Sequence, residues 1–255
     1  MPSMNNKGLA DIGMSDPGST QTTEKKIILE AKDIHKLFHT GGDQLIVLEG
    51  VNLKIRQGSI IAIFGASGVG KSTLLYILGT IDRPTSGQVV IDSTNVFDLE
   101  ENQLAEFRNR TVGFVFQGHH LLPEFSALEN VMMPMLIGRQ DWASAKVRAE
   151  TLLQDVGLSE RVGHKPGELS GGEQQRVAVA RALAGSPQVI LADEPSGNLD
   201  KKTGAALFDM ISTLSRTYHQ AFVIVTHDEG IGRRADRMYE LADGRLTDVT
   251  SEHKI

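Results

Sequence analysis

Three short, continuous apolar runs predict strands that are buried on both faces. They are IIAIFG at 60–65, VILAD at 189–193 and AFVIVTH at 221–227. Runs of this length, rich in β-branched residues, are typical of parallel strands covered by helices. Stretches with helical spacing alternate with them, beginning with STLLYILG at 72–79, a few residues after the first run. The alternation predicts an α/β fold with a parallel sheet and helices on both faces.

Two β-branched segments precede the first of these runs, IILEAKDIHKLF from Ile27 and LIVLEGVNLKI from Leu45. A Gly41-Gly42-Asp43 turn separates them, so both are predicted to be strands. The first 26 residues are rich in Gly, Ser, Thr and Asn and have no apolar stretch long enough for a signal peptide. We expect residues 1–26 to form a disordered extension and residues 27–255 to form the folded domain.

The middle of the chain has a different pattern. From about residue 102 to residue 187 the apolar positions mostly recur at helical spacing, and no strong strand run follows Phe116. We therefore expect a mostly helical subdomain to be inserted into the α/β core. The methionines of this stretch are expected to fill its own core; they are Met132, Met133 and Met135.

Composition narrows the possible functions. The 255 residues are 40% hydrophobic and 23% charged, with a formal net charge of -6, which argues against a nucleic-acid-binding surface. The chain has no cysteine, which excludes disulfides, thiolate zinc sites and cysteine nucleophiles. No apolar run approaches the ~20 residues needed to span a bilayer. Any membrane association is therefore expected to come through partner proteins.

A glycine-rich loop, GASGVGKS at 65–72, follows the first buried strand and precedes a helical run. That context is the one in which such a loop binds phosphate, whereas a glycine-rich turn that contains lysine by chance does not require it. Gly65 and Gly70 let the backbone approach the ligand, and N–H groups at the helix start point at phosphate oxygens. Lys71 supplies a cation, and the Ser72 hydroxyl is placed to ligate Mg²⁺. The predicted ATP-binding residues of this loop are Gly65, Ala66, Ser67, Gly68, Val69, Gly70, Lys71, Ser72 and Thr73.

An acidic pair, Asp193 and Glu194, ends the second buried run. A buried carboxylate without a partner is unfavourable, and Mg²⁺ or its water shell would give Asp193 one. Glu194 points the opposite way in an extended chain, so it is predicted to polarise the attacking water as general base. The simpler alternative is a pair of solvent-facing carboxylates. The glycine-rich loop elsewhere in the chain favours the catalytic interpretation.

The segment LSGGEQQR at 169–176 predicts a second anion site. Ser170 and Glu173 have the spacing of a capping box before a helical run. A capped helix explains these two residues, but it does not require Gly171 and Gly172, which leave N–H groups open to an anion. Because the glycine-rich loop already serves the ATP γ-phosphate, we expect Ser170, Gly171 and Gly172 to act in trans. This predicts a homodimer with two nucleotides at its interface.

Together, GASGVGKS, LSGGEQQR and VILADEP resemble the ATP-binding-cassette (ABC) family, and the resemblance covers nearly all of residues 27–246. It implies a P-loop NTPase, ABC-type nucleotide-binding domain. The expected architecture is a mixed or parallel core sheet, an antiparallel β subdomain and the inserted helical subdomain. The resemblance also implies an ATP hydrolase coupled to transport, with ATP as substrate and Mg²⁺ as cofactor.

Four further residues take a role only from this resemblance. Gln117 matches the glutamine that joins the metal site to the helical insertion, and His227 matches the histidine that contacts the γ-phosphate. Asp200 lies in the loop that crosses the family's dimer interface. Phe38 stands where a tyrosine usually stacks on adenine, and phenylalanine keeps the π-face. Without the resemblance, His227 would be a structural hydrogen-bonding residue and Phe38 a core residue. The implied catalytic residues are Lys71, Gln117, Glu194 and His227, and the implied metal ligands are Ser72, Gln117 and Asp193.

Within the family, three segments resemble the ATPase subunits of lipoprotein-releasing transporters: QGHHLLPEFSALENVMMPMLIG (117–138), ADEPSGNLD (192–200) and LADGRLTD near the C-terminus. Gly118 departs from the aromatic residue usual before the two histidines. Macrolide-exporter ATPases share much of this pattern, as do cell-division ATPases that transmit force without transport, and both remain alternatives. DNA-repair and translation ATPases usually have two cassettes or a long coiled coil, and neither is visible in this sequence.

The resemblance implies a peripheral location on the cytoplasmic face of a bacterial inner membrane. Integral membrane permease subunits would read the lipoprotein cargo there, and no nucleic-acid partner is expected. The turn from His119 to Pro123 directly follows Gln117. We expect this turn to contact a cytoplasmic helix of a permease; the alternative is that Leu121 and Leu122 fill the core of the insertion.

Overall fold

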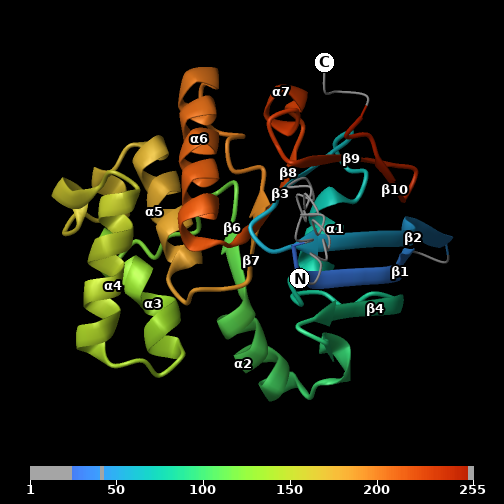
Figure 1. The fold of residues 1–255 in the computed structure, drawn as a ribbon, viewed down its shortest axis with the longest axis horizontal. Coiled ribbons are helices and arrows are strands. Elements are labelled where there is room, and N and C mark those ends of the chain that lie inside the picture. The colour runs from blue at the N-terminus through green and yellow to red at the C-terminus, as the bar shows by residue number, and fades with distance from the viewer. Residues whose placement is uncertain (1–24, 41–42, 252–255) are drawn as a thin grey trace, which may run out of the picture.

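The computed structural model describes residues 25–40 and 43–251, and it contains two sheets (Figure 1). The smaller sheet is antiparallel, with the order β2-β1-β4-β5. Its strands are β1 (Ile27–Thr40), β2 (Asp43–Arg56), β4 (Ser86–Ile91) and β5 (Thr94–Asn95). The two predicted N-terminal strands are therefore confirmed. Gly41 and Gly42 of the predicted turn, and residues 1–24 of the predicted extension, lie outside the described residues.

The larger sheet has the order β10-β9-β3-β8-β7-β6. All of its neighbouring pairs are parallel except β9 with β10. The strands are β3 (Ile60–Phe64), β6 (Val112–Val115), β7 (Val189–Asp193), β8 (Ala221–Thr226), β9 (Arg237–Ala242) and β10 (Arg245–Asp248). The three apolar runs thus form adjacent central strands, because parallel strands need residues that tolerate burial on both faces.

Helices cover the sheets and form a lobe at one side. They are α1 (Lys71–Leu78), α2 (Glu101–Thr111), α3 (Ala127–Ile137), α4 (Trp142–Asp155), α5 (Gly171–Leu183), α6 (Lys201–Tyr218) and α7 (Glu229–Gly232). Short 3₁₀ turns lie at Val96–Asp98, Ser159–Arg161 and Pro166–Glu168. In Figure 1, α3, α4 and α5 lie together at the side of the molecule away from the antiparallel sheet. The interval 102–187 also includes β6, which belongs to the six-stranded sheet.

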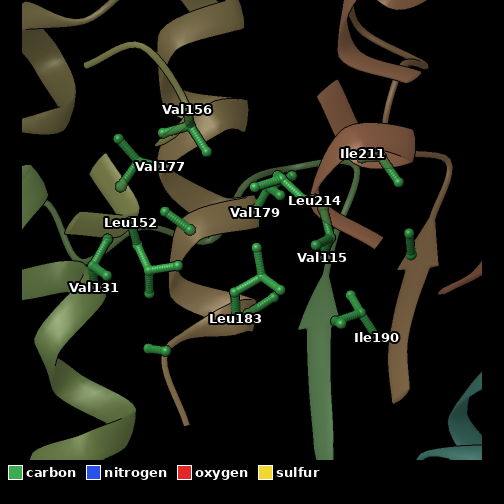
Figure 2. Packing of buried hydrophobic residues seen from close by; sticks show 14 of the residues in the cluster. Val115, Val131, Leu152, Val156, Val177, Val179, Leu183, Ile190, Ile211 and Leu214 are labelled. Atoms are coloured by element: carbon green, nitrogen blue, oxygen red, sulfur yellow. The ribbon is translucent and has the colours of Figure 1, made fainter. Parts of the chain in front are cut away.

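Two apolar clusters hold these layers together. One joins α1 to both sheets through residues such as Leu75, Ile63 and Leu53. The other joins the helical lobe to the six-stranded sheet, and in Figure 2 Val179 and Leu183 of α5 lie between Leu152 of α4 and Val115 and Ile190 of the sheet. Met132 and Met135 are buried in this second cluster, as expected for the core of the insertion, but the prediction was wrong for Met133, which is half-buried and is not part of the cluster. Among the described residues, no helix is long and apolar enough to cross a membrane.

Candidate nucleotide site

A cleft of about 650 Å³ opens where the glycine-rich loop meets the carboxyl ends of β7 and β8. Eleven of the residues predicted for the site line it, together with Leu45 and Val47 of β2. Parallel strands bring their carboxyl ends to one edge of a sheet, which is why residues far apart in the sequence meet there. The eleven are Phe38, Ser67, Gly68, Gly70, Lys71, Ser72, Thr73, Gln117, Asp193, Glu194 and His227.

The glycine-rich loop needs glycine because of its protein neighbours as well as its ligand. Gly65 has φ 155°, and a Cβ there would lie 2.4 Å from the Leu241 carbonyl oxygen. Gly70 has φ 106°, and a Cβ would lie 2.7 Å from Val47. Neither position admits a side chain without movement of the backbone or of β2. Clearance for phosphate is therefore not the only reason for glycine at these two positions.

Lys71 is buried and its ammonium group is held at the loop. Its Nζ donates to the Gly65 and Ala66 carbonyl oxygens, at 2.9 Å each. Gly70 caps α1 without a side-chain hydrogen bond, so the first N–H groups of this helix receive no acceptor from the capping residue. A cation beside open N–H groups at a helix start is an anion-binding arrangement.

Asp193 lies between two hydroxyl groups of α1. Ser72 Oγ donates to its Oδ1 at 3.0 Å, and the Tyr76 hydroxyl donates to its Oδ2 at 3.4 Å. Burial raises the pKa of the Asp193 carboxyl, and the two hydroxyl hydrogen bonds partly oppose that shift. Burial, and then the charge of Asp193, raise the pKa of Tyr76. The carboxylate is thus partly buried, and in the described part of the chain its side-chain hydrogen-bond partners are two neutral hydroxyls, so its oxygens can serve as ligands for a hard cation.

These oxygens fit Mg²⁺. Among residues 25–40 and 43–251, no group of three or more His, Cys, Asp or Glu residues could hold a metal ion alone. Mg²⁺ does not need such a cage, since in nucleotide sites it takes one or two protein ligands and completes its shell with phosphate oxygens and water. Ser72 and Asp193, side by side at the cleft, supply that kind of partial shell.

Glu194 pairs with His227. The Nδ1 atom of His227 lies 2.7 Å from Glu194 Oε2, and 65% of the His227 side chain is exposed. The extended-chain argument for Glu194 was wrong, because its backbone is in the left-handed region with φ 43°. Hydrogen bonds from Glu194 N to the Val225 carbonyl and from Gly197 N to the Glu194 carbonyl hold that turn. Asp193 and Glu194 still bond different partners, Ser72 and His227. Their side chains diverge because the backbone turns at Glu194, and not because successive residues of a strand alternate.

Gln117 and Phe38 approach the cleft from opposite sides. Gln117 accepts a 3.0 Å hydrogen bond at its carbonyl from Asn198 Nδ2, which ties it to the loop before α6. Phe38 is 41% exposed, and the Lys36 ammonium lies 4.9 Å from its ring centroid. Lys36 is itself held by Asp82 and the Arg83 carbonyl, at 2.8 Å each. A cation over one face of the ring leaves the other face for a stacking partner.

Ser170, Gly171 and Gly172 do not line this cleft. Ser170 caps α5, and the predicted capping box with Glu173 is present. Hydrogen bonds from Ser170, and then from Arg161, lower the pKa of Glu173 to about 2. A Cβ at Gly171 would meet nothing within 4 Å. The start of α5 is therefore capped and open at Gly171, and it does not belong to the chain's own nucleotide cleft.

Comparison with known proteins decides the family. A profile described as ABC transporter matches residues 48–197. The lipoprotein-releasing system ATP-binding protein LolD of Syntrophus aciditrophicus is 51% identical over 219 residues, which are 86% of this chain and 98% of that protein. The chain belongs to the ABC transporter family. It is an ABC ATPase with an ATP-binding domain of the P-loop type, as the sequence motifs implied.

A second relative and a solved structure support the same family. The LolD protein of Acinetobacter baylyi is 51% identical over 224 residues, 88% of this chain and 98% of that protein. Among solved structures, a dimeric ATP-binding cassette in a post-hydrolysis state bound to ADP and Pi has a TM-score of 0.79 and 38% identity. It covers 87% of this chain and 99% of that chain. The cassette fold, with its antiparallel and mixed sheets, is thus shared with ATP-binding subunits over nearly their whole length.

A second cleft of the ABC ATPase, of about 470 Å³, lies between α2, α3 and the C-terminal end of α5. We call it the lobe groove. Arg181 of α5 spans from the groove to the turn after Gln117, donating to the His119 and His120 carbonyls at 2.7 and 2.6 Å. Leu121 packs on the lobe's core, whereas Leu122 is 40% exposed. Only part of the predicted partner turn is therefore free to meet another protein. The lining residues include Ile81, Arg108, Phe116, His120, Ile137 and Arg181.

Sequence reasoning missed two residues of the ABC ATPase site. Tyr76 reaches Asp193, and its position four residues after Ser72 puts both on one face of α1, which is a signal that the sequence contained. Asn198 exchanges hydrogen bonds with Gln117 through its side-chain oxygen and nitrogen, at 3.4 and 3.0 Å. No local pattern predicts that pair, because 81 residues separate the two.

Proposed function

We propose that this chain is the ATPase subunit of a lipoprotein-releasing transporter at a bacterial inner membrane. The observation that carries the proposal is the 51% identity to a lipoprotein-releasing system ATP-binding protein over 98% of that protein's length. The chain lies on the cytoplasmic side as a peripheral subunit. Integral permease subunits of the LolC/LolE kind bind the lipoprotein and carry it out of the membrane.

The phosphate-binding loop holds the triphosphate of ATP. Lys71 exchanges its two carbonyl partners for β- and γ-phosphate oxygens, and the open N–H groups of α1 donate to the same oxygens. Phe38 stacks on adenine with the ring face that Lys36 leaves free. Ser72, Asp193 and Gln117 would hold Mg²⁺, which would neutralise part of the charge of the bound phosphates.

Hydrolysis depends on Glu194 and His227. The Glu194 carboxylate takes a proton from a water molecule in line with the γ-phosphate. His227 donates through Nδ1 to this carboxylate, because an ionised carboxylate only accepts, and the pair keeps the base pointed into the cleft. Donation from its second ring nitrogen, Nε2, to a γ-phosphate oxygen requires the doubly protonated ring, in which both nitrogens donate. Lys71 stabilises the charge that develops on the transferred phosphoryl group.

A second copy completes each site. Ser170, Gly171 and Gly172 at the start of α5 present N–H groups to the γ-phosphate held by the other protomer. Support comes from the open cradle at Gly171 and from the dimeric ABC cassettes among the similar structures. Closure on two ATP molecules is a ligand-driven shift between open and closed pairs, and phosphate loss reverses it.

The lobe groove receives a cytoplasmic helix of a permease subunit. Its apolar lining suits the apolar face of a helix. The groove carries Arg108 and Arg181 and no carboxylate, so an acidic side chain on the permease helix would complement it. Gln117 connects the nucleotide cleft to the turn that borders this groove, which gives closure a mechanical route to the membrane subunits.

The deciding experiment is purification of the tagged chain with its membrane subunits in detergent, followed by reconstitution. ATP-dependent release of acylated protein from proteoliposomes or spheroplasts to a soluble carrier is the expected result. Release that persists with the Glu194→Gln variant would contradict the proposal. So would export of a macrolide by the complex, or activation of a cell-wall hydrolase without any loss of lipoprotein from the membrane.

A further inference from the structure

Tyr76 is a polar residue that the nucleotide chemistry leaves unexplained. It does not line the nucleotide cleft, yet its hydroxyl lies 3.4 Å from Asp193 Oδ2. The side chain is half-buried. A tyrosine placed behind a carboxylate, away from the ligand, acts on the ligand only through that carboxylate.

The backbone of Tyr76 is held by hydrogen bonds from the turn that follows α1. Its carbonyl oxygen accepts from the N–H groups of Ile81 and Asp82, at 2.9 and 3.2 Å. These bonds close the turn that ends α1 and set the direction in which the side chain leaves the helix. Since Ser72 lies four residues earlier on the same helix, the two hydroxyls face Asp193 from one rigid surface.

Each of the two hydroxyls donates to a different oxygen of the Asp193 carboxylate. Ser72 bonds Oδ1 at 3.0 Å and Tyr76 bonds Oδ2. Ser72 and Asp193 would both hold the cation, and a Ser72 hydroxyl engaged in that way would no longer fix Asp193 through Oδ1. Among the described residues, the Tyr76 hydroxyl would then be the remaining side-chain donor that orients the carboxylate, through Oδ2.

We propose that Tyr76 is a positioning residue for metal-dependent nucleotide binding, acting by hydrogen bonding to Asp193 Oδ2. Groups that orient metal ligands affect metal affinity without touching the metal. The proposal concerns the isolated ABC ATPase and does not depend on the transported cargo or on the membrane subunits.

The test is the Tyr76→Phe variant, which keeps the ring and removes the hydroxyl. The Kd for ADP is measured by calorimetry in EDTA and in excess Mg²⁺; ADP avoids hydrolysis and carries no γ-phosphate for a second copy. The ratio of the two Kd values reports the gain in affinity that the metal provides. We expect the variant to lose about tenfold of that gain, the lower end of the range for such groups, because the contact is long. Its Kd in EDTA stays at the wild-type value, which also verifies folding.

Tyr218→Phe is the matched control, because the Tyr218 hydroxyl also bonds an aspartate, Asp155, and neither residue lines the nucleotide cleft. It should leave the ratio unchanged. In ATPase assays, Tyr76→Phe should raise the half-activating Mg²⁺ concentration while kcat at saturating Mg²⁺ stays near wild type. A ratio equal to wild type would overturn the proposal. Equal weakening in EDTA and in Mg²⁺ would overturn it too, since that result assigns Tyr76 to packing alone.

Discussion

The Nδ1 atom of His227 lies 2.7 Å from Oε2 of Glu194, and the bond joins the loops that leave β8 and β7. Both residues follow the carboxyl ends of adjacent parallel strands, whose register pairs Asp193 with Val225. The sheet therefore sets the distance between the proposed base and its partner. Either residue alone has an ordinary structural explanation, and their contact at the cleft is what favours catalysis.

Replacing Glu194 with glutamine should slow ATP hydrolysis by about 10²- to 10⁴-fold, the usual contribution of a general base. The amide keeps the size of the side chain, so ATP binding should persist and a nucleotide-bound dimer should accumulate. Single-turnover hydrolysis and size-exclusion chromatography with ATP measure the two effects. Hydrolysis at the wild-type rate would reject the general-base role.

Replacing Ser170 with arginine should lower hydrolysis by at least about 10²-fold, the loss expected when donors to a developing anion are blocked. Each copy should still bind ATP, because Ser170 lies away from its own cleft. Ser126→Arg is the matched control: Ser126 also caps a helix with a capping box, to Glu129. An equal loss of hydrolysis in both variants would mean that the effect comes from the loss of a helix cap and not from a blocked anion site.

Replacing Phe38 with alanine should weaken ATP binding by about tenfold, the value of one stacked base. Phe38→Tyr should keep the affinity, because the ring face is unchanged. Binding of inorganic triphosphate, which has no base, should be the same for all three proteins. Leu45→Ala removes another exposed apolar side chain of the cleft and serves as control. An alanine variant with wild-type affinity for ATP would return Phe38 to a packing role.

Replacing Ile137 with aspartate should prevent co-purification with permease subunits and leave the ATPase of the isolated chain intact. Ile137 lines the lobe groove and is 67% exposed, so folding should tolerate the change. Val147→Asp changes a residue of 64% exposure that does not line the groove. If the Ile137 variant still co-purifies with the permease subunits, the lobe groove is not their docking surface.

Acid should weaken the cap of α5. The pKa of Glu173 is about 2 in the folded chain against an ordinary 4.5. A lowered folded-state pKa means that the stabilisation is complete above the ordinary value and is lost as the pH falls toward the folded one. We expect Glu173→Gln to cost about 1 kcal/mol at neutral pH, the usual value of a helix cap. Urea unfolding of both proteins should show this difference shrinking below a pH of about 4.5. A difference that does not vary with pH would contradict the assignment.

Local sequence patterns predicted helices and strands well where a single effect, such as apolar burial or a helix cap, decides the local structure. The run from Ile60 predicted a buried strand because an uninterrupted β-branched run can bury both faces. The spacing of Ser170 and Glu173 predicted a cap that is present in the structure. The sequence EPSG at 194–197 contains the signal of a β-turn, but the positive φ of Glu194 was not predictable, because it also depends on the hydrogen bond from its N–H to Val225 of the neighbouring strand.

The sequence by itself determined the family, the glycine-rich loop between a strand and a helix, and the capped start of α5, because short-range spacing and helix or strand periodicity encode them. Only the tertiary structure decided which residues meet. The order β3-β8-β7 brings Lys71, Asp193 and His227 to one edge. The packing of α1 puts Tyr76 behind Asp193, and the lobe keeps Ser170 away from its own cleft. These contacts depend on how whole elements pack, and packing is set by the summed burial of many distant residues.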